Sequence, residues 1–247
     1  MSPKINLDLL INFKIIRSVS NFRPLIKKPL IIISLRLFLF FVLFTNFISA
    51  QYSISTAERN ALIGIYQSTN GANWSQSWDL TKDPQNWYGV KIKNHSVSGL
   101  NLRGNVLSGN FPTNISVFTN LEVLDLSNNN LVGEVSPSIG SLSNLISLSI
   151  NDNKLTGDPT AALSSLSNLT ELSVGHNLFA ISDLDLLLQN FTKLKILNIA
   201  NLNLTSVPQK ISGFNQLQVL DLSDNQLKTG FNYLSNLTNL TDLNLAG

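Results

Sequence analysis

The sequence predicts an α/β-type solenoid: a horseshoe with a parallel β-sheet on its concave face and a helical cap at its N-terminal side. A pattern of leucine and asparagine recurs about every 24 residues, which is the signature of stacked structural repeats. A short amphipathic segment followed by the chain's three tryptophans precedes the first copy. Because one repeat cannot bury its leucines alone, neighbouring copies must share a continuous core. We expect three parts, residues 1–50, 51–96 and 97–247.

Residues 1–50 have the layout of a secretory signal. Seven of the 17 basic residues but only one of the 15 acidic residues lie there. The apolar run Leu37–Phe44 leads into small residues, and we expect cleavage after Ala50 and a secreted or cell-surface protein. Alternatively, Pro29–Leu35 joins this run and forms an uncleaved signal anchor, with Arg36 near the cytoplasmic edge. The protein would then be tethered to the membrane.

Residues 51–96 are expected to cap the open end of the first repeat. The segment from Ser55 to Glu58 reads S-T-A-E, a candidate capping box that would begin a helix. Trp74, Trp78 and Trp87 follow it. Such rings can stack on a sugar, but they are better suited to sealing the core of the first repeat.

Residues 97–247 are predicted to hold six full copies of the repeat and a truncated seventh. The copies share the pattern L-x-x-L-x-L-x-x-N-x-L and begin at Val97, Leu121, Leu145, Leu169, Leu194, Leu217 and Leu240. The fourth and sixth positions have the period of a short strand with one buried face. The ninth-position asparagine both donates and accepts hydrogen bonds, so a stack of them would pair backbone groups between copies. Leu202 takes this position in the fifth copy, where we expect a local distortion with Asn201 or Asn203 as a partial substitute.

These motifs resemble those of leucine-rich repeat proteins, and the first three copies resemble the plant-like subclass. Leu107–Pro112 (LSGNFP) and Leu131–Val135 (LVGEV) are close to the L-x-G-x-I-P pattern of that subclass. The third copy keeps Gly157 and then departs from the pattern, and later copies lose the glycine.

The cap shows the same resemblance with one departure. Trp87–Val90 (WYGV) resembles the W-x-G-V strand of plant-type caps. The resemblance implies a cysteine on each side of this strand, but Gln85 and Ile92 stand at those places, and the chain has no cysteine. In this respect it looks most like exported bacterial proteins with the same repeat.

Composition argues against several classes of function. Residues 51–247 carry ten basic and 14 acidic residues, a net charge of −4, so nucleic-acid binding lacks its main source of affinity. The sequence has no calcium-loop or paired-histidine motif, and we expect neither a metal ion nor another cofactor. Its two histidines, His95 and His176, have no strained nucleophile turn beside them, so we expect no catalytic residues and no enzyme activity.

The outward face of the sheet is therefore the predicted site of function, as an extracellular module for protein–protein or protein–ligand interaction. Positions two, three, five, seven and eight of each copy should face outward and form a small, polar, net acidic surface. The candidate ligand-binding residues are Arg103, Asp125, Asp152, Glu171, His176, Asn198, Asp221 and Asp224. This surface suits a protein or peptide partner, because charge guides encounter and register. The alternative is a structural or adhesive surface protein without a specific ligand on this face.

Two features leave alternatives open. Sequons of the form N-x-S/T occur at Asn73, Asn94, Asn114, Asn168, Asn190, Asn203, Asn236 and Asn239. They would carry glycans in a eukaryotic secretory route, or they recur because the repeat itself recurs. The sequence also stops partway through a seventh strand without a polar cap, and we expect it to be a fragment or to have its apolar end covered by another copy.

Overall fold

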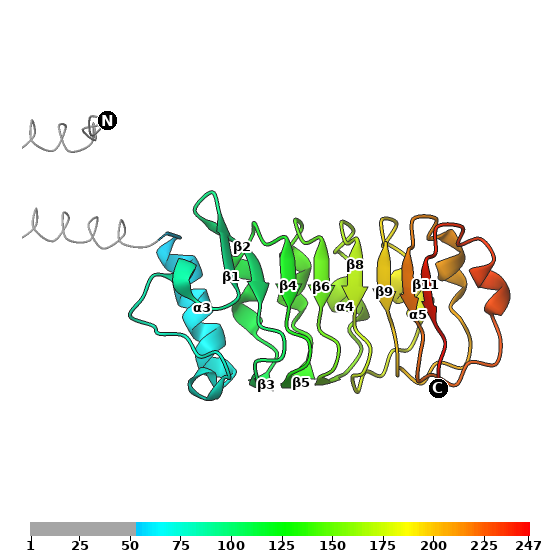
Figure 1. Cartoon of the computed structure of the whole chain (residues 1–247), viewed down its shortest axis with the longest axis horizontal. Helices are drawn as coiled ribbons and strands as arrows, with labels where there is room; N and C mark the ends of the chain where they lie inside the picture. The colour runs from blue at the N-terminus through cyan, green and yellow to red at the C-terminus, as the bar shows by residue number, and fades with distance from the viewer. Residues whose placement is uncertain (1–52) are drawn as a thin grey trace, which may run out of the picture. The chain divides into compact units, whose positions relative to one another are not determined.

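Short strands, one from each repeat, line up side by side along the molecule (Figure 1). The computed structural model describes residues 53–247, so the predicted secretory signal lies outside the described residues. The strands of the larger sheet are β1 (Val90–Lys93), β2 (Ser96–Asn101), β4 (Val123–Asp125), β6 (Ser147–Ser149), β8 (Glu171–Ser173), β9 (Ile196–Asn198), β10 (Val219–Asp221) and β11 (Asp242–Asn244). They pair in this order, β1 antiparallel to β2 and all the others parallel.

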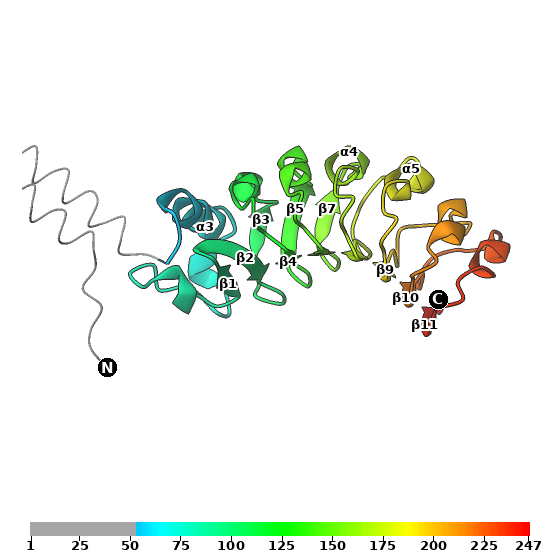
Figure 2. The ribbon, with the colours of Figure 1, turned by 90° about the horizontal axis from the view of Figure 1, so that it is seen from above.

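A second, smaller sheet in the first three repeats and a set of short helices complete the solenoid. The smaller sheet contains β3 (Ser108–Asn110), β5 (Asn130–Glu134) and β7 (Lys154–Thr156). The α-helices are α3 (Thr56–Ser68), α4 (Thr160–Leu163) and α5 (Leu184–Leu188). The 3-10 helices are η1 (Gly71–Asn73), η2 (Pro84–Asn86), η3 (Thr113–Val117), η4 (Pro137–Ser141), η5 (Gln209–Gly213) and η6 (Phe231–Leu234). Figure 2 shows the larger sheet on the inner side of the bend and the repeat helices on the outer side.

The predicted repeat register is confirmed strand by strand. The fourth-position residues pair with one another in the order Leu100, Leu124, Leu148, Leu172, Leu197, Leu220 and Leu243. All of them except Leu243 are completely buried. One continuous apolar core therefore runs along the described chain, as expected for repeats that share their interfaces.

The cap begins with the predicted helix, but its glutamate has a different partner from the one a capping box implies. Ser55 Oγ accepts a hydrogen bond from the backbone N–H of Glu58 at 3.2 Å, which caps α3. In a capping box the glutamate returns to the N–H of the cap residue. Here the buried Glu58 carboxylate accepts hydrogen bonds from Ser55 Oγ at 3.0 Å and from Val97 N at 2.9 Å. The residue that helps to begin the helix thus also fastens it to the first repeat.

The three tryptophans seal the first repeat, as predicted. Trp78 stacks on Trp87 with ring centroids 4.8 Å apart and meets Trp74 edge-on at 4.9 Å. All three are at most 5% exposed, and each indole N–H donates to a backbone carbonyl at 2.9 Å. These rings therefore have no free face on which a sugar could stack.

The ninth-position asparagines form the predicted ladder. Asn129 Oδ1 accepts hydrogen bonds from the N–H groups of Asn105 at 3.1 Å and Leu107 at 2.9 Å. Its Nδ2 donates to the carbonyls of Leu102 and Leu126 at 2.9 and 3.0 Å, so one amide joins two copies. The corresponding contacts recur at Asn153, Asn177 and Asn225.

The ladder is interrupted at Leu202, but the expected substitution does not occur. Within the described chain, the side chains of Asn201 and Asn203 form no hydrogen bond. Both residues instead have left-handed backbone, with φ of 50° and 57°. Leu202 is buried at the same place as the asparagines and contributes packing without an amide. The prediction that a neighbouring asparagine takes over was therefore wrong.

A second series of asparagines lies one residue before four of the seven repeats, at Asn120, Asn144, Asn168 and Asn239. Nδ2 of Asn144, Asn168 and Asn239 donates to a carbonyl of the preceding copy at 2.9, 2.8 and 2.6 Å. Asn168 and Asn239 each begin a sequon, so their contacts supply a structural reason for the recurrence of Asn-Leu-Thr.

None of the helices in residues 53–247 combines the length and the apolar character needed to cross a bilayer.

Candidate interaction surface

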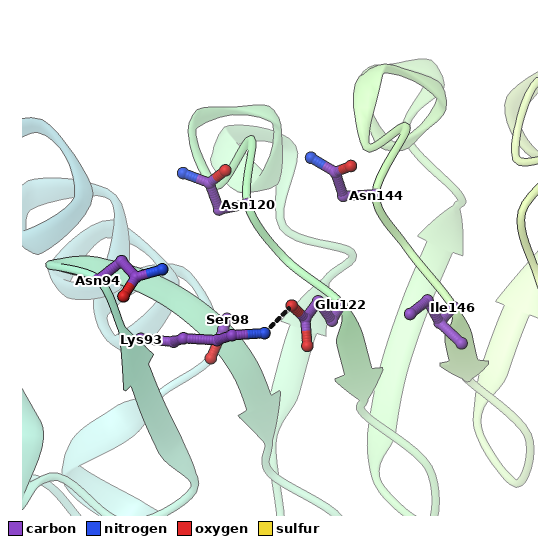
Figure 3. Close-up of a pocket in the computed structure, with 7 residues that line it drawn as sticks. All are labelled: Lys93, Asn94, Ser98, Asn120, Glu122, Asn144 and Ile146. Atoms are coloured by element: carbon purple, nitrogen blue, oxygen red, sulfur yellow. Dashed lines mark hydrogen bonds and ion pairs between the residues drawn. The ribbon is translucent and has the colours of Figure 1, made fainter.

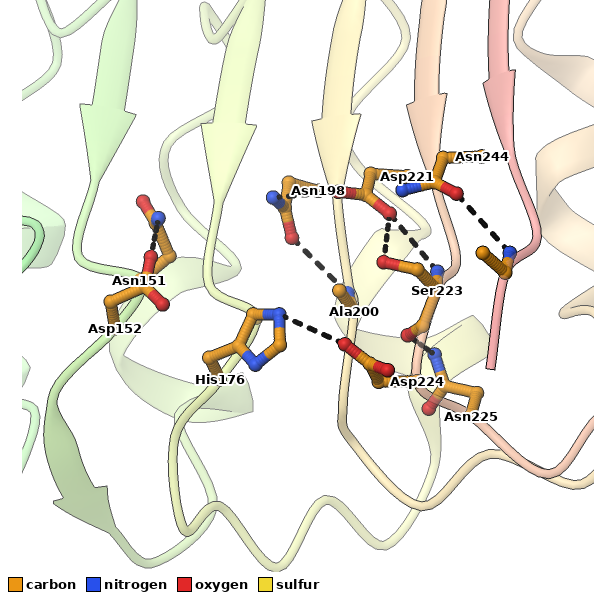
Figure 4. Close-up of polar contacts among 12 residues, drawn as sticks. Asn151, Asp152, His176, Asn198, Ala200, Asp221, Ser223, Asp224, Asn225 and Asn244 are labelled. Atoms are coloured by element: carbon orange, nitrogen blue, oxygen red, sulfur yellow. Dashed lines mark hydrogen bonds and ion pairs between the residues drawn. The ribbon is translucent and has the colours of Figure 1, made fainter.

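In several repeats the fifth-position side chain shapes the turn that follows its strand. Asp125 Oδ1 accepts hydrogen bonds from Ser127 N at 3.0 Å and from Ser127 Oγ at 2.6 Å, and Asp221 makes the same two contacts with Ser223. Asn198 Oδ1 accepts from the N–H two residues ahead at 3.1 Å (Figure 4). These short local bonds stabilise a turn. Three of the predicted ligand-binding residues are therefore already used by the fold.

The eighth position has a left-handed backbone in every full copy. The residues and their φ angles are Gly104 (61°), Asn128 (55°), Asp152 (53°), His176 (50°), Asn201 (50°) and Asp224 (55°). Glycine, asparagine, aspartate and histidine are the residues that tolerate this conformation best. The polar column that the sequence shows at this position is thus explained by the backbone, without a ligand.

The structure brings two of the predicted residues, His176 and Asp224, close together. His176 Nε2 lies 3.7 Å from Asp224 Oδ2, across the intervening fifth copy (Figure 4). Asp152, the third candidate in the same column, accepts a hydrogen bond from Asn151 Nδ2 at 2.6 Å. Among residues 53–247, no three side chains of histidine, aspartate or glutamate converge in a way that would hold a metal ion.

Arg103 and Glu171 lie at neither the fifth nor the eighth position of their copies. Arg103 is exposed at the seventh position of the first copy. Glu171, half-buried at the third position of the fourth copy, accepts a hydrogen bond from Ser147 Oγ at 2.8 Å.

Sequence reasoning missed a pocket of about 320 Å³ at the N-terminal end of the larger sheet (Figure 3). Its lining comes from the β1–β2 hairpin, from the second position of three copies and from the residues that precede two copies. The lining residues are Lys93, Asn94, Ser98, Asn120, Glu122, Asn144 and Ile146. β1 and the β1–β2 turn precede the periodic part of the sequence, so no spacing could align them with the repeats.

Charge and apolar surface meet in this pocket. Lys93 Nζ contacts Glu122 Oε1 at 2.8 Å, and the hydrogen bond and charge of Lys93 lower the pKa of Glu122. Ile146 is 43% exposed, and Val123 beside it on the neighbouring strand is 38% exposed. The second residue of every other repeat is polar, so the isoleucine at this position in the third copy was the one feature of the sequence that indicated the pocket.

Comparison with known proteins identifies the repeats. Residues 119–179 and residues 216–237 match two family models, each described as leucine-rich repeat. No curated protein sequence matches the chain.

Solved structures share the fold over most of the described residues. The PEPR1–AtPEP1 complex is 24% identical with a TM-score of 0.61, covering 74% of this chain and 27% of that one. The ectodomain of the Arabidopsis receptor kinase HAESA, solved with an N-terminally extended IDA peptide hormone ligand, is 25% identical with a TM-score of 0.52. That match covers 81% of this chain and 41% of the HAESA chain. The ectodomain of GASSHO1/SCHENGEN3 from Arabidopsis thaliana, in complex with CASPARIAN STRIP INTEGRITY FACTOR 2, is 24% identical with a TM-score of 0.54, covering 76% and 29%.

The chain spans less than half the length of each of these three proteins. The matched segments, the parallel sheet and the N-terminal helix together show that residues 53–247 fold as a leucine-rich repeat solenoid.

Proposed function

We propose that this solenoid is an interaction module that binds a protein or peptide through its concave face. The observation that carries the proposal is a set of outward side chains that the fold does not use. Arg103 offers a charge, and Val123 and Ile146 offer exposed apolar surface beside a pocket. The HAESA ectodomain, 25% identical, was solved with a peptide hormone ligand, which supports a peptide or protein as the partner.

The proposed setting is the cell surface or the extracellular space. It is supported by the basic, apolar leader in residues 1–50 and by the extracellular-type repeats of the structural neighbours. The absence of cysteine supports the further proposal that the chain is similar to exported bacterial members of this fold. A net charge of −4 outside the leader argues against nucleic acid as the partner.

We further propose that the module is not an enzyme. The left-handed backbone of the eighth position accommodates both His176 and the nearby Asp224, so neither residue needs a catalytic role to account for it. The residues around the pair include no strained nucleophile turn. Replacing His176 with asparagine, which tolerates the same backbone, should leave partner binding and stability unchanged.

A charge exchange on the concave face tests the binding proposal. Asp125 and Asp221 are unsuitable targets, because their loss would open the turns they hold. The test variant is Arg103→Glu with Glu171→Lys, which keeps the net charge. The matched control is Glu134→Lys with Lys228→Glu, which makes the same exchange at exposed positions away from the larger sheet.

The measurement is recovery of a partner from the protein's native surroundings, with full-length variants of equal melting temperature. We expect the wild type and the control to retain the partner and the concave variant to lose it. If both variants recover the same partner equally well, the concave face is not the binding surface. The structural or adhesive alternative would then be favoured.

A further inference from the structure

We infer that the pocket between the β1–β2 hairpin and the first three repeats is a subsite for an extended peptide segment carrying an aliphatic side chain. This inference rests on the proposed function and specifies part of the partner. Four independent features of the pocket lead to it: an unpaired amide on the repeat side, a second on the hairpin, an apolar wall and a balanced charge.

The unpaired amide on the repeat side belongs to Asn120. The asparagine preceding a repeat normally donates to a carbonyl of the copy before it, as Asn144 and Asn168 do. Asn120 has the same position before the second repeat, but its side chain forms no hydrogen bond within residues 53–247. The reason is topological, because the β1–β2 hairpin stands where the turn of a preceding copy would lie. Asn120 therefore lines the pocket with a free donor and a free acceptor.

The amide on the hairpin belongs to Asn94. It lies in the β1–β2 turn with φ of 51°, and its exposed side chain is likewise without a hydrogen bond in the described part of the chain. Figure 3 shows Asn94 on the hairpin side of the pocket and Asn120 on the repeat side. Two amides on opposite sides match an extended backbone, which presents N–H and C=O groups alternately.

The apolar wall is formed by Ile146, with Val123 beside it. Ile146 lines the pocket, and Val123 pairs in the sheet with Ser147, the next residue after Ile146. An aliphatic side chain in the pocket would cover Ile146, which is now 43% exposed, while Val123 lies next to the pocket and not in its lining. The volume of about 320 Å³ is at the small end of ligand sites, which suits a short stretch of peptide.

The balanced charge narrows the ligand class. Lys93 and Glu122 neutralise one another across the pocket, and both remain accessible at 59% and 38% side-chain exposure. A phosphate or another polyanion is disfavoured, because the Glu122 carboxylate would repel it beside the single Lys93 ammonium. A sugar would find no aromatic ring among the lining residues. A neutral peptide backbone with an aliphatic side chain satisfies both the amides and the apolar wall.

The probe for this inference is a displayed library of linear peptides, selected against the immobilised full-length protein. The strongest peptide is then synthesised, and its binding is measured by fluorescence anisotropy. The two pocket variants are Asn120→Leu and Ile146→Lys. Their matched controls are Gln216→Leu and Gln218→Lys, which place the same changes at the same two repeat positions of the sixth copy, where both residues are exposed.

We expect the selected peptides to share an aliphatic residue and to bind each pocket variant about tenfold more weakly, which corresponds to about 1.4 kcal/mol, with unchanged binding to both controls. Equal binding to pocket and control variants, or no enriched peptide, would overturn the inference. Either of those results, combined with a native partner that is sensitive to the Arg103/Glu171 exchange, would leave the proposed function standing. If the protein captures its native partner equally well with and without the Arg103/Glu171 exchange, the proposed function is overturned, whatever the peptide experiment shows.

Discussion

The first three repeats and the next three bury the same fourth-position leucines, yet only the first three carry the second sheet. Gly109 and Gly133, within β3 and β5, and Gly157, directly after β7, have φ of 107°, 77° and 75°. Ile181, Ser206 and Thr229 hold this position in the later repeats, where one isolated bridge joins Ser206 to Thr229. Because a β-branched residue resists positive φ, the second sheet depends on glycine, whereas the larger sheet depends only on leucine spacing.

The two regions also differ in their polar interior. In the first region Asn105, Asn129 and Asn153 form an unbroken ladder. In the second, Leu202 separates Asn177 from Asn225. The first region is therefore tied together by two sheets and a continuous ladder, and the second by one sheet and an interrupted one. We expect the later repeats to be the less stable region.

The largest expected effect tests whether the fourth-position leucine contributes equally to the free energy of unfolding in both regions. Leu124→Ala removes a completely buried side chain and should lower the free energy of unfolding by about 2–5 kcal/mol. Leu243→Ala makes the same change at the same repeat position, where the leucine is 44% exposed, and should cost less than half as much. Chemical denaturation of both variants measures the difference. Equal losses would contradict the repeat register on which the comparison depends.

The next effect tests the role of glycine in the second sheet. In Gly109→Ala, the new Cβ would overlap the carbonyl oxygen of Ser68, and the residue would keep an unfavourable φ. We expect a loss of more than about 1 kcal/mol. Thr229→Gly, at the corresponding position of the sixth copy, should cost about 1 kcal/mol or less. A thermal unfolding series decides between them, and a harmless Gly109→Ala would show that the second sheet does not need glycine.

A third change repairs the ladder. Leu202→Asn places an amide where Asn177 and Asn225 stand in neighbouring copies, and it should accept hydrogen bonds from the fourth copy as Asn177 does from Leu155. The restored hydrogen bonds should raise the free energy of unfolding by about 0.5–1.5 kcal/mol. The loss of leucine packing reduces this gain. Amide hydrogen exchange of the fourth and fifth copies provides the readout. Faster exchange there would mean that Leu202 packing matters more than the ladder.

The smallest effect concerns the junction between the two regions. Asp158 accepts hydrogen bonds from Thr160 N, Ser182 N and Ser182 Oγ at 2.9, 3.1 and 2.8 Å, which links the third copy to the fourth. Partial burial opposes its ionisation, but the hydrogen bonds from Thr160 and Ser182 outweigh burial and lower its pKa to about 2. A lowered pKa means that the carboxylate stabilises the fold above its unfolded pKa of about 3.9. This stabilisation is lost as the pH falls from about 4 to 2.

Since Asp158 is exposed, its contribution should be about 1 kcal/mol or less. Denaturation curves across this pH range should show a smaller acid-dependent loss for Asp158→Asn than for the wild type. Identical curves would mean that the junction does not depend on this charge.

The sequence predicted the fold well because repetition reports spacing directly. The positions of Leu100 to Leu220 and the asparagine ladder follow from periods that a single chain displays. The binding role of the surface stays a prediction, because in the sequence a polar residue such as Asp125 or Asp152 looks the same whether it meets a ligand or its own backbone. The pocket was missed, since β1 and the β1–β2 turn lie outside the periodic segment and form it only through tertiary contact with the first three repeats.

The left-handed backbone at the eighth position restricts how such a surface can evolve. Drift or selection there is confined to a small set of amino acids, since most replacements would strain the turn before they met any partner. New binding specificities must therefore arise mainly at the second, third and seventh positions. Among related chains, amino-acid variation on the inner face should concentrate at these three repeat positions, while the fifth and eighth positions should vary little.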